Sequence, residues 1–112
     1  MPLLELTVDR QGDVVRLALA GELDISSASR VEREIALLED TSPPVLVLDL
    51  RGLKFMDSTG LRIVVSANAR AESAERRFVV VRGPEPVHRI FRITRLEERL
   101  DMVDDAAELE TA

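Results

Sequence analysis

The sequence predicts a single α/β domain over residues 1–112, built on a mixed, mainly parallel sheet of four or five strands with about four helices. Segments with the pattern of strands alternate along the chain with amphipathic segments of helical spacing. This alternation favours right-handed crossovers between parallel strands, with helices on at least one side of the sheet. A hairpin is also predicted at the N-terminus, and its antiparallel pair makes the sheet mixed.

Two alternating segments predict the N-terminal hairpin. Apolar and polar residues alternate over residues 4–8, and the strand pattern resumes over residues 14–20. Between them, Gln11-Gly12-Asp13 supplies a turn. Gly21-Glu22-Leu23-Asp24 then ends the second strand.

A serine-rich stretch is expected to begin the first helix. Ser29 and Glu32 fit a capping box, although Asp24 or Ser26 fits equally well as the cap of a slightly longer helix. Two prolines in the segment 41–44 end this helix. Its expected apolar face comprises Ala28, Val31, Ile35 and Leu38.

Residues 45–50 are nearly all apolar, as expected of a central strand that is covered on both faces. A second helix is predicted after residues 57–60, and a further buried strand over residues 78–81. The apolar face of the second helix is expected to comprise Leu61, Val64, Val65, Asn68 and Ala71.

The C-terminal part is predicted to contain two helices and a short strand. The third helix runs from Pro86 to about Thr94, the strand covers residues 100–103 and a terminal helix covers residues 104–110. The apolar face of the third helix is expected to comprise Val87, Ile90, Phe91 and Ile93.

The composition excludes several classes of protein. The chain has no cysteine, which rules out disulfides, cysteine-bound zinc and thiol catalysis. A net charge of −6 argues against binding to phosphate backbones, and three phenylalanines are too few for a stacking platform on single-stranded nucleic acid. The apolar runs fall short of the ~18 residues of a spanning helix, and no signal peptide is recognised. We therefore expect a cytoplasmic protein that binds neither membranes nor nucleic acid directly.

Charge is distributed unevenly along the chain. Six arginines and one acid, Glu85, lie between Arg76 and Arg95, whereas seven acids and one arginine, Arg99, follow from Glu97 onward. Such a bipolar surface can steer a protein partner, but solvated helix faces explain the same pattern. The sequence leaves both interpretations open.

Polar residues cluster where two strands are predicted to end. Asp57-Ser58-Thr59-Gly60 follows the central strand, and Asp24 follows the preceding strand. Because sites in open α/β sheets lie beyond the carboxyl ends of the strands, we expect two acids and two hydroxyls near one edge. These residue types are also preferred helix N-caps, and Gly60 fits close packing, so helix capping alone remains an alternative.

No catalytic residues are predicted, and the chain is not expected to be an enzyme. A serine hydrolase would have to pair Ser58 with His88, the single histidine, without the Gly-x-Ser-x-Gly turn. His88 is instead expected to be an ordinary surface or boundary residue of the third helix. The C-terminal aspartates lack the spacing of a calcium loop, and the glycines are scattered singly. We therefore expect no metal site and no cofactor.

Three motifs resemble those of a known family. Gly21-Glu22-Leu23-Asp24, Leu48-Asp49-Leu50 and Asp57-Ser58-Thr59-Gly60-Leu61 occur in the order found in the STAS domain, specifically in the bacterial anti-sigma factor antagonists. The strand at residues 78–81 and the helix at residues 87–94 extend the resemblance to essentially the whole chain.

The resemblance implies a STAS-like fold and a partner-switching protein. Such antagonists bind an anti-sigma factor that is also a GHKL-type serine kinase, and this frees the sigma factor. The kinase phosphorylates the serine after the motif aspartate, which is Ser58 here, and a PPM-type phosphatase restores the antagonist. Thr59 is the second-choice acceptor. The resemblance places the partner-binding residues at Asp24, Asp57, Ser58, Thr59 and Gly60.

The sequence departs from the family pattern at two positions and leaves two other functions open. Arg62 replaces a residue that is small in many members, and Arg95 stands where glycine is common. A STAS scaffold or sensor of a stress-signalling assembly is one alternative, with Ser58 regulatory or silent. A small nucleotide-binding protein that uses Asp57 and Ser58 is the other, although no phosphate-binding glycine loop supports it.

Overall fold

The computed structural model describes residues 3–105 and 107. Along the chain its elements are β1 (Leu4–Gln11), β2 (Val14–Leu23), α1 (Ala28–Glu39), β3 (Val45–Met56), α2 (Ser58–Ser73), β4 (Arg77–Val81), α3 (Glu85–Ile93), a short 3₁₀ turn (Leu96–Glu98) and β5 (Asp101–Val103).

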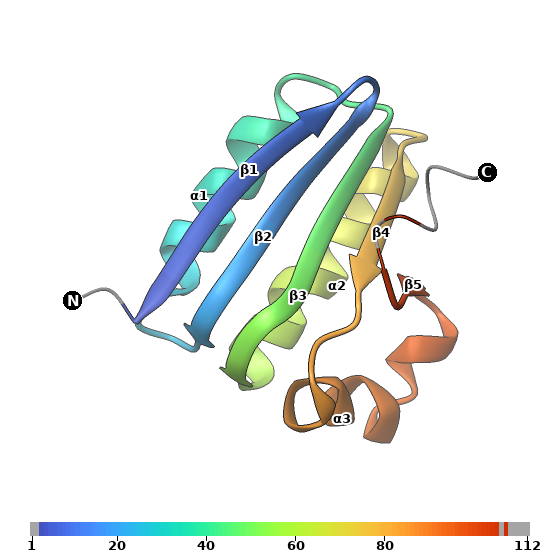
Figure 1. The fold of residues 1–112 in the computed structure, drawn as a ribbon. Helices are drawn as coiled ribbons and strands as arrows, with labels where there is room; N and C mark the ends of the chain where they lie inside the picture. The colour runs from blue at the N-terminus through green and yellow to red at the C-terminus, as the bar shows by residue number, and fades with distance from the viewer. Residues whose placement is uncertain (1–2, 106, 108–112) are drawn as a thin grey trace.

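The described residues form one five-stranded sheet with the order β1-β2-β3-β4-β5. β1 pairs with β2 antiparallel, and all the other neighbours are parallel. In Figure 1, α1 and α2 lie together on one face of this sheet, and α3 lies beyond the end of β4. The predicted α/β class, with a mixed sheet and an N-terminal hairpin, is therefore confirmed.

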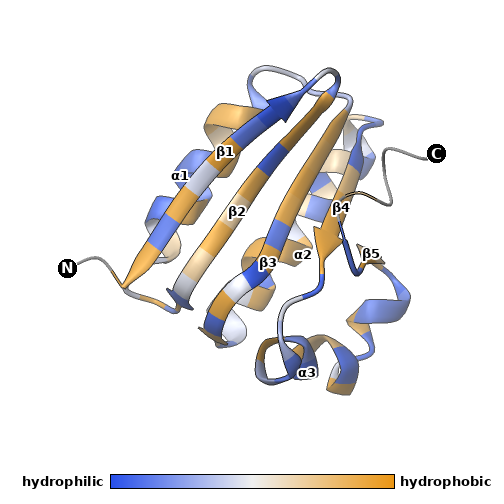
Figure 2. Cartoon of the chain, viewed as in Figure 1, coloured by the Kyte–Doolittle hydropathy of each residue, from blue (hydrophilic) through white to orange (hydrophobic). Residues whose placement is uncertain are grey.

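The main core lies between the sheet and the helices α1 and α2. Leu17, Leu48 and Val80 from three adjacent strands meet Val31 of α1 and Val64 of α2 there, and all five are buried. Figure 2 shows apolar residues along β2, β3 and β4, with hydrophilic residues mixed into β1 at the edge of the sheet. The core therefore fixes the positions at which the central strands end.

β3 is longer than predicted, because the strand pattern changes within it. The nearly continuous apolar run ends at Leu50, yet the strand continues to Met56. The register against β2 slips twice, and each slip adds one extra residue to β3. Bulges of this kind change which residues face the core, so Leu53 and Met56 are buried at a spacing of three.

The start of α1 and the apolar faces of two helices also differ from expectation. Ser27, not Ser29, is the N-cap residue of α1, so the capping box is wrong, although Ala28, Val31, Ile35 and Leu38 are buried as predicted. On α2 the buried residues include Ile63 and Ala67, whereas Val65 is exposed. Ile93 is 68% exposed because it lies at the last position of α3, past the core.

The terminal helix expected over residues 104–110 falls largely outside the described residues. Asp104 and Asp105 themselves are not helical. Within the described chain there are three α-helices and the 3₁₀ turn, compared with the expected four helices. The short strand predicted near residues 100–103 is confirmed as β5.

Candidate functional site

β2 and β3 end side by side, and this places two of the predicted site residues next to each other in the fold. Leu23 at the end of β2 pairs with Met56 at the end of β3. Asp24 and Asp57 are the next residues of the two strands. The backbone amide of Asp57 also donates a hydrogen bond of 3.3 Å to the carbonyl oxygen of Leu23. Asp24 and Asp57 therefore lie at the same edge of the sheet, as expected.

Asp57 caps α2. Its backbone is extended, and its side-chain Oδ1 accepts a hydrogen bond of 2.9 Å from the Thr59 amide. Aspartate is a preferred N-cap residue, and the Asp57 carboxylate here accepts from the Thr59 amide, which would otherwise lack a partner in the first turn. The capping interpretation therefore holds for Asp57 and explains its structural role.

Ser58 has a different environment from its neighbours. It is the first residue of α2 and is exposed, whereas Thr59 is half-buried. Among the residues that the structure describes, none forms a hydrogen bond with the Ser58 hydroxyl. The first turn of α2 contains no acidic residue. An accessible hydroxyl therefore lies at the positive end of the helix dipole.

Gly60 allows α2 to begin close to the strand ends. A Cβ atom at this position would lie 2.4 Å from Cγ of Met56 and 2.9 Å from Cδ2 of Leu23. Both distances are too short for carbon atoms. The glycine is thus explained by packing, and this packing holds Ser58 over the ends of β2 and β3.

Asp24 organises the turn before α1 without capping the helix. Its Oδ1 accepts hydrogen bonds from the Ser26 amide at 2.9 Å and from the Ser26 hydroxyl at 2.6 Å. The hydroxyl bond lowers the pKa of Asp24 below its usual value. The buried Ser27 hydroxyl accepts from the Asp24 amide and donates to the Glu22 carbonyl. Asp24 is therefore ionised and fixed in a turn beside Asp57.

Sequence reasoning missed two apolar residues next to this acidic edge. Ile25 follows Asp24 and is 83% exposed, and Phe55 precedes Met56 and is 47% exposed. Large exposed apolar side chains beside polar groups are typical of protein-binding surfaces. Phe55 faces outward because of the second bulge in β3, which the sequence pattern did not predict.

His88 is not available to Ser58. It is buried on α3, stacks on Phe91 and has its Nε2 atom 2.7 Å from a carboxylate oxygen of Glu97. The expectation of a surface or boundary residue is wrong, because the 3₁₀ turn that carries Glu97 packs against α3. His88 therefore links two C-terminal elements and does not pair with a nucleophile.

Arg62 and Arg95 are the two residues that depart from the family pattern, and the structure describes both of them. Arg62 lies one turn after Ser58 and lines an open groove between α1 and α2, together with Glu32 of α1. Arg95 adopts the left-handed backbone conformation, with a φ of 63°. Glycine adopts this conformation without strain, which explains why glycine suits that position.

Much of the uneven charge is paired within the fold. Arg77 lies 2.8 Å from Asp101, and Arg82 lies 3.0 Å from Asp104. Because β4 and β5 are adjacent, the basic and acidic segments neutralise each other there. The bipolar pattern therefore reflects internal pairing at these positions and not a single basic face.

Within residues 3–105 and 107, no group of three or more His, Asp and Glu side chains is arranged to hold a metal ion. No helix in the described part of the chain has both the length and the apolar character needed to cross a membrane.

The fold is an α/β domain in which Asp24, Asp57 and the exposed Ser58 lie at one edge of the sheet. A family model described as "Mlab, STAS domain" matches residues 6–104. The chain belongs to the STAS domain family. Because an anti-sigma factor antagonist is 30% identical to it over 76% of its length, it belongs, within this family, to the anti-sigma factor antagonists. Members of this group are regulatory proteins and not enzymes, which confirms the prediction that the chain is not an enzyme.

Similar proteins are known from several bacteria. The anti-sigma-F factor antagonist RsfB of Mycobacterium tuberculosis is 30% identical over 88 residues, which are 76% of this chain and 72% of RsfB. The anti-sigma-B factor antagonist of Listeria monocytogenes is 27% identical over 101 residues, covering 90% and 89% of the two chains. The crystal structure of an anti-sigma factor antagonist from Mycobacterium paratuberculosis superposes with a TM-score of 0.90 at 26% identity, covering 96% of this chain and 92% of that chain.

Proposed function

We propose that this chain is a cytoplasmic, single-domain anti-sigma factor antagonist that is controlled by phosphorylation of Ser58. It binds a GHKL-type serine kinase that is also an anti-sigma factor, and this binding releases the sigma factor for transcription. The kinase phosphorylates Ser58 and thereby loses its partner, and a PPM-type phosphatase restores the unmodified antagonist. The observation that carries the proposal is the exposed Ser58 hydroxyl on the first turn of α2.

The acidic edge and its apolar neighbours form the proposed docking surface. Asp24 and Asp57 lie at the ends of adjacent strands, and the exposed side chains of Ile25 and Phe55 flank them. Apolar contact gives the complex affinity, while the carboxylates orient the partner. Ser58 lies within this surface, so a kinase docked here has its substrate hydroxyl within its own interface.

A phosphate on Ser58 should leave the antagonist folded. It adds about −1.5 to −2 charges, which takes the net charge from −6 to about −8. At the N-terminus of α2 it meets free amides and the positive end of the dipole, an interaction worth on the order of 0.3–2 kcal/mol. The modification therefore favours the local structure of α2.

The same phosphate should disrupt a closed interface. An unpaired dianion that loses its water costs at least several kcal/mol, and each 1.4 kcal/mol is about a tenfold change in affinity. Because the destabilisation of the complex exceeds any effect on the fold, the phosphorylated protein dissociates without unfolding. The switch is thus electrostatic and local.

One experiment tests the partner and the acceptor together. The purified chain serves as bait in pull-downs made with ADP and with ATP, followed by peptide mass spectrometry of the bait. We expect a GHKL-type kinase to be retained with ADP and released with ATP, with phosphate on Ser58. The Ser58→Ala variant should retain the same kinase in ATP. Stoichiometric phosphate on Thr59, or on Ser58→Ala protein, would show that Ser58 is not the acceptor.

A further inference from the structure

The face of the sheet opposite α1 and α2 is covered, although no helix of the described chain lies on it (Figure 1). Val47 of β3 and Val79 and Val81 of β4 are fully buried there. They form a second apolar cluster, separate from the main core, and partly buried valines of β2, β3 and β5 surround it. We call this cluster the valine floor. Its complete burial requires atoms above the sheet.

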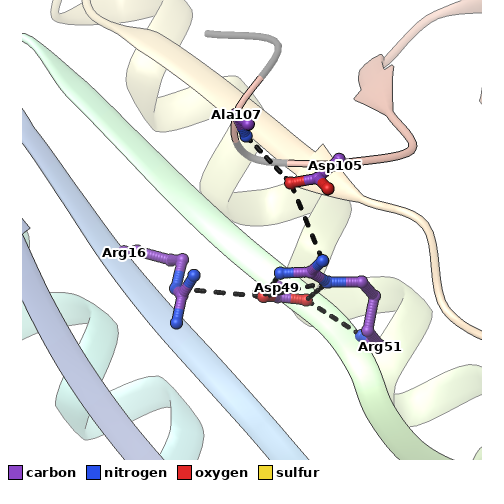
Figure 3. A network of polar contacts seen from close by, with 5 residues as sticks. All are labelled: Arg16, Asp49, Arg51, Asp105 and Ala107. Atoms are coloured by element: carbon purple, nitrogen blue, oxygen red, sulfur yellow. Dashed lines mark hydrogen bonds and ion pairs between the residues drawn. The ribbon is translucent and has the colours of Figure 1, made fainter. Parts of the chain in front are cut away.

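The chain that follows β5 crosses this face. Asp104 Oδ1 lies 3.0 Å from a guanidinium nitrogen of Arg82, which follows β4. Asp105 Oδ1 lies 3.8 Å from Nη1 of Arg51 on β3. Since β4 lies between β3 and β5 in the sheet, residue 105 reaches Arg51 only by passing in front of β4. Figure 3 shows Asp105 above Arg51 and Asp49 on this side of the sheet.

A buried carboxylate holds Arg51 in place. Asp49 is 4% exposed and accepts hydrogen bonds from Arg51 at its backbone amide (3.0 Å), at Nε (3.1 Å) and at Nη2 (2.8 Å). Arg16 of β2 also approaches Asp49, with its Nε atom 3.9 Å from Oδ2. One carboxylate therefore lies between two guanidinium groups, and the cluster keeps one positive charge in excess. Asp105 lies against this excess charge.

We propose that the helix-free face carries a binding surface for acidic peptide segments, and that Asp104 and Asp105 of this chain occupy it intramolecularly. The surface consists of the valine floor with Arg51 and Arg82 at its rim. The segment suits it, because residues 104–112 contain four acids and no basic residue. An acidic peptide of a partner protein would have to compete with this segment for the same two arginines.

The surface is distinct from the edge that carries Ser58. Asp49 and Arg51 lie on β3 before its end, whereas Ser58 begins α2 after that strand. The proposal therefore does not depend on phosphorylation. Its failure would leave the partner-switching function untouched, and failure of the switch would leave the peptide surface untouched.

The first test locates the segment in the full chain. Because the sequence has no cysteine, Ala107→Cys offers a single attachment point for a nitroxide spin label. We expect the label to broaden the NMR amide signals of Arg51, Val79 and Val81 more than that of Ile35 on α1. The double variant Asp104→Asn/Asp105→Asn should remove most of this difference, because it removes the ion pairs with Arg82 and Arg51. It leaves the Asp49–Arg51 contacts intact. Arg10→Gln, on the edge strand, is the control and should change nothing.

The second test asks whether the surface accepts an acidic peptide as a ligand. A synthetic peptide with the sequence of residues 104–112 is titrated into the isotope-labelled double variant. We expect saturable shifts at Arg51, Val79 and Val81, which disappear at high salt and with a peptide whose acids are replaced by their amides. Absence of shifts would overturn the proposed peptide surface. Label-induced broadening that depends on protein concentration would assign the segment to a second copy and overturn the intramolecular arrangement.

Discussion

The amide of Asp57 donates a hydrogen bond to the carbonyl oxygen of Leu23, with 3.3 Å between the two atoms. This bond joins the residue that caps α2 to the last residue of β2. The Asp57 side chain in turn accepts from the Thr59 amide. The orientation of Ser58 therefore depends on the end of a neighbouring strand as well as on its own helix.

The cap can be separated from any role of Asp57 in docking. Asp57→Ala should lower the free energy of unfolding by about 1 kcal/mol, because the Thr59 amide loses its acceptor. Asp57→Ser should retain most of the stability, since a serine hydroxyl also caps, yet it removes the carboxylate. Urea unfolding and kinase binding are measured on both variants. If Asp57→Ser binds as tightly as the wild type, the carboxylate has no part in docking.

The charge mechanism at Ser58 makes a prediction that does not need the kinase reaction. Ser58→Asp should weaken kinase binding at least tenfold, because a carboxylate then enters the interface. Its melting temperature should stay within a few degrees of the wild type, since an acid at a helix N-terminus is favourable. Ser66→Asp, two turns further along α2 and exposed, makes the same change in net charge and serves as the control. Undiminished binding by Ser58→Asp would contradict the mechanism.

The sequence predicted the order of strands and helices because the buried faces keep a regular period. Leu17 and Leu19 alternate with polar or small residues, and Ala28, Val31, Ile35 and Leu38 keep helical spacing. The period fails where the backbone is irregular. Two bulges in β3 changed which side chains face outward after Leu50, so Phe55 was not predicted as a surface residue.

The site was predicted in part for the same reason. Asp24 and Asp57 follow strands whose pairing could be inferred from the pattern, and the structure places them at adjacent strand ends. The burial of His88 depends on a 3₁₀ turn that packs against α3, and the position of Asp105 depends on an ion pair with Arg51. Both are contacts between distant segments with no local periodic pattern.

Asp24 allows charge and local structure to be tested apart. An asparagine retains a carbonyl oxygen that can accept from the Ser26 amide, so Asp24→Asn should leave the circular dichroism spectrum and the melting temperature nearly unchanged. If Asp24 contacts the partner, its lost charge should lower affinity on the order of tenfold, mainly through slower association. Stopped-flow binding at low and high salt measures this effect. A lower melting temperature with unchanged binding would show that Asp24 serves only the turn.

The departure at Arg95 predicts a more stable variant. A left-handed conformation costs a residue other than glycine roughly 1 kcal/mol or more, and Arg95 has a φ of 63° after the end of α3. Arg95→Gly should therefore raise the free energy of unfolding by up to about 1 kcal/mol. Arg99→Gly removes the same charge from an exposed residue whose φ is −105° and should not stabilise the protein. An equal effect of both variants would point to charge and not to the backbone.

The Asp49 cluster predicts a stability that depends on pH. Burial raises the pKa of Asp49, but hydrogen bonds from the Arg51 side chain and amide outweigh it, so the pKa is lowered overall. A group whose pKa is lower in the folded state stabilises the protein above its unfolded pKa, about 3.9 for aspartate, and loses this effect as the pH falls through the folded value. Asp49→Asn lacks the contribution at every pH.

The free energies of unfolding of the wild type and of Asp49→Asn should therefore differ most near neutral pH. At pH 7 we expect Asp49→Asn to be less stable by about 1–3 kcal/mol, because Arg51 and Arg16 lose the carboxylate charge between them and Arg51 loses one of its two acceptor oxygens. Below pH 4 the difference should shrink as the wild-type carboxyl takes up a proton. Urea unfolding at pH 7, 5 and 3 measures it, with Asp13→Asn in the hairpin turn as the control for losing one exposed negative charge. A difference that stays constant down to pH 3 would show that shape, and not the ionised carboxylate, makes Asp49 stabilising.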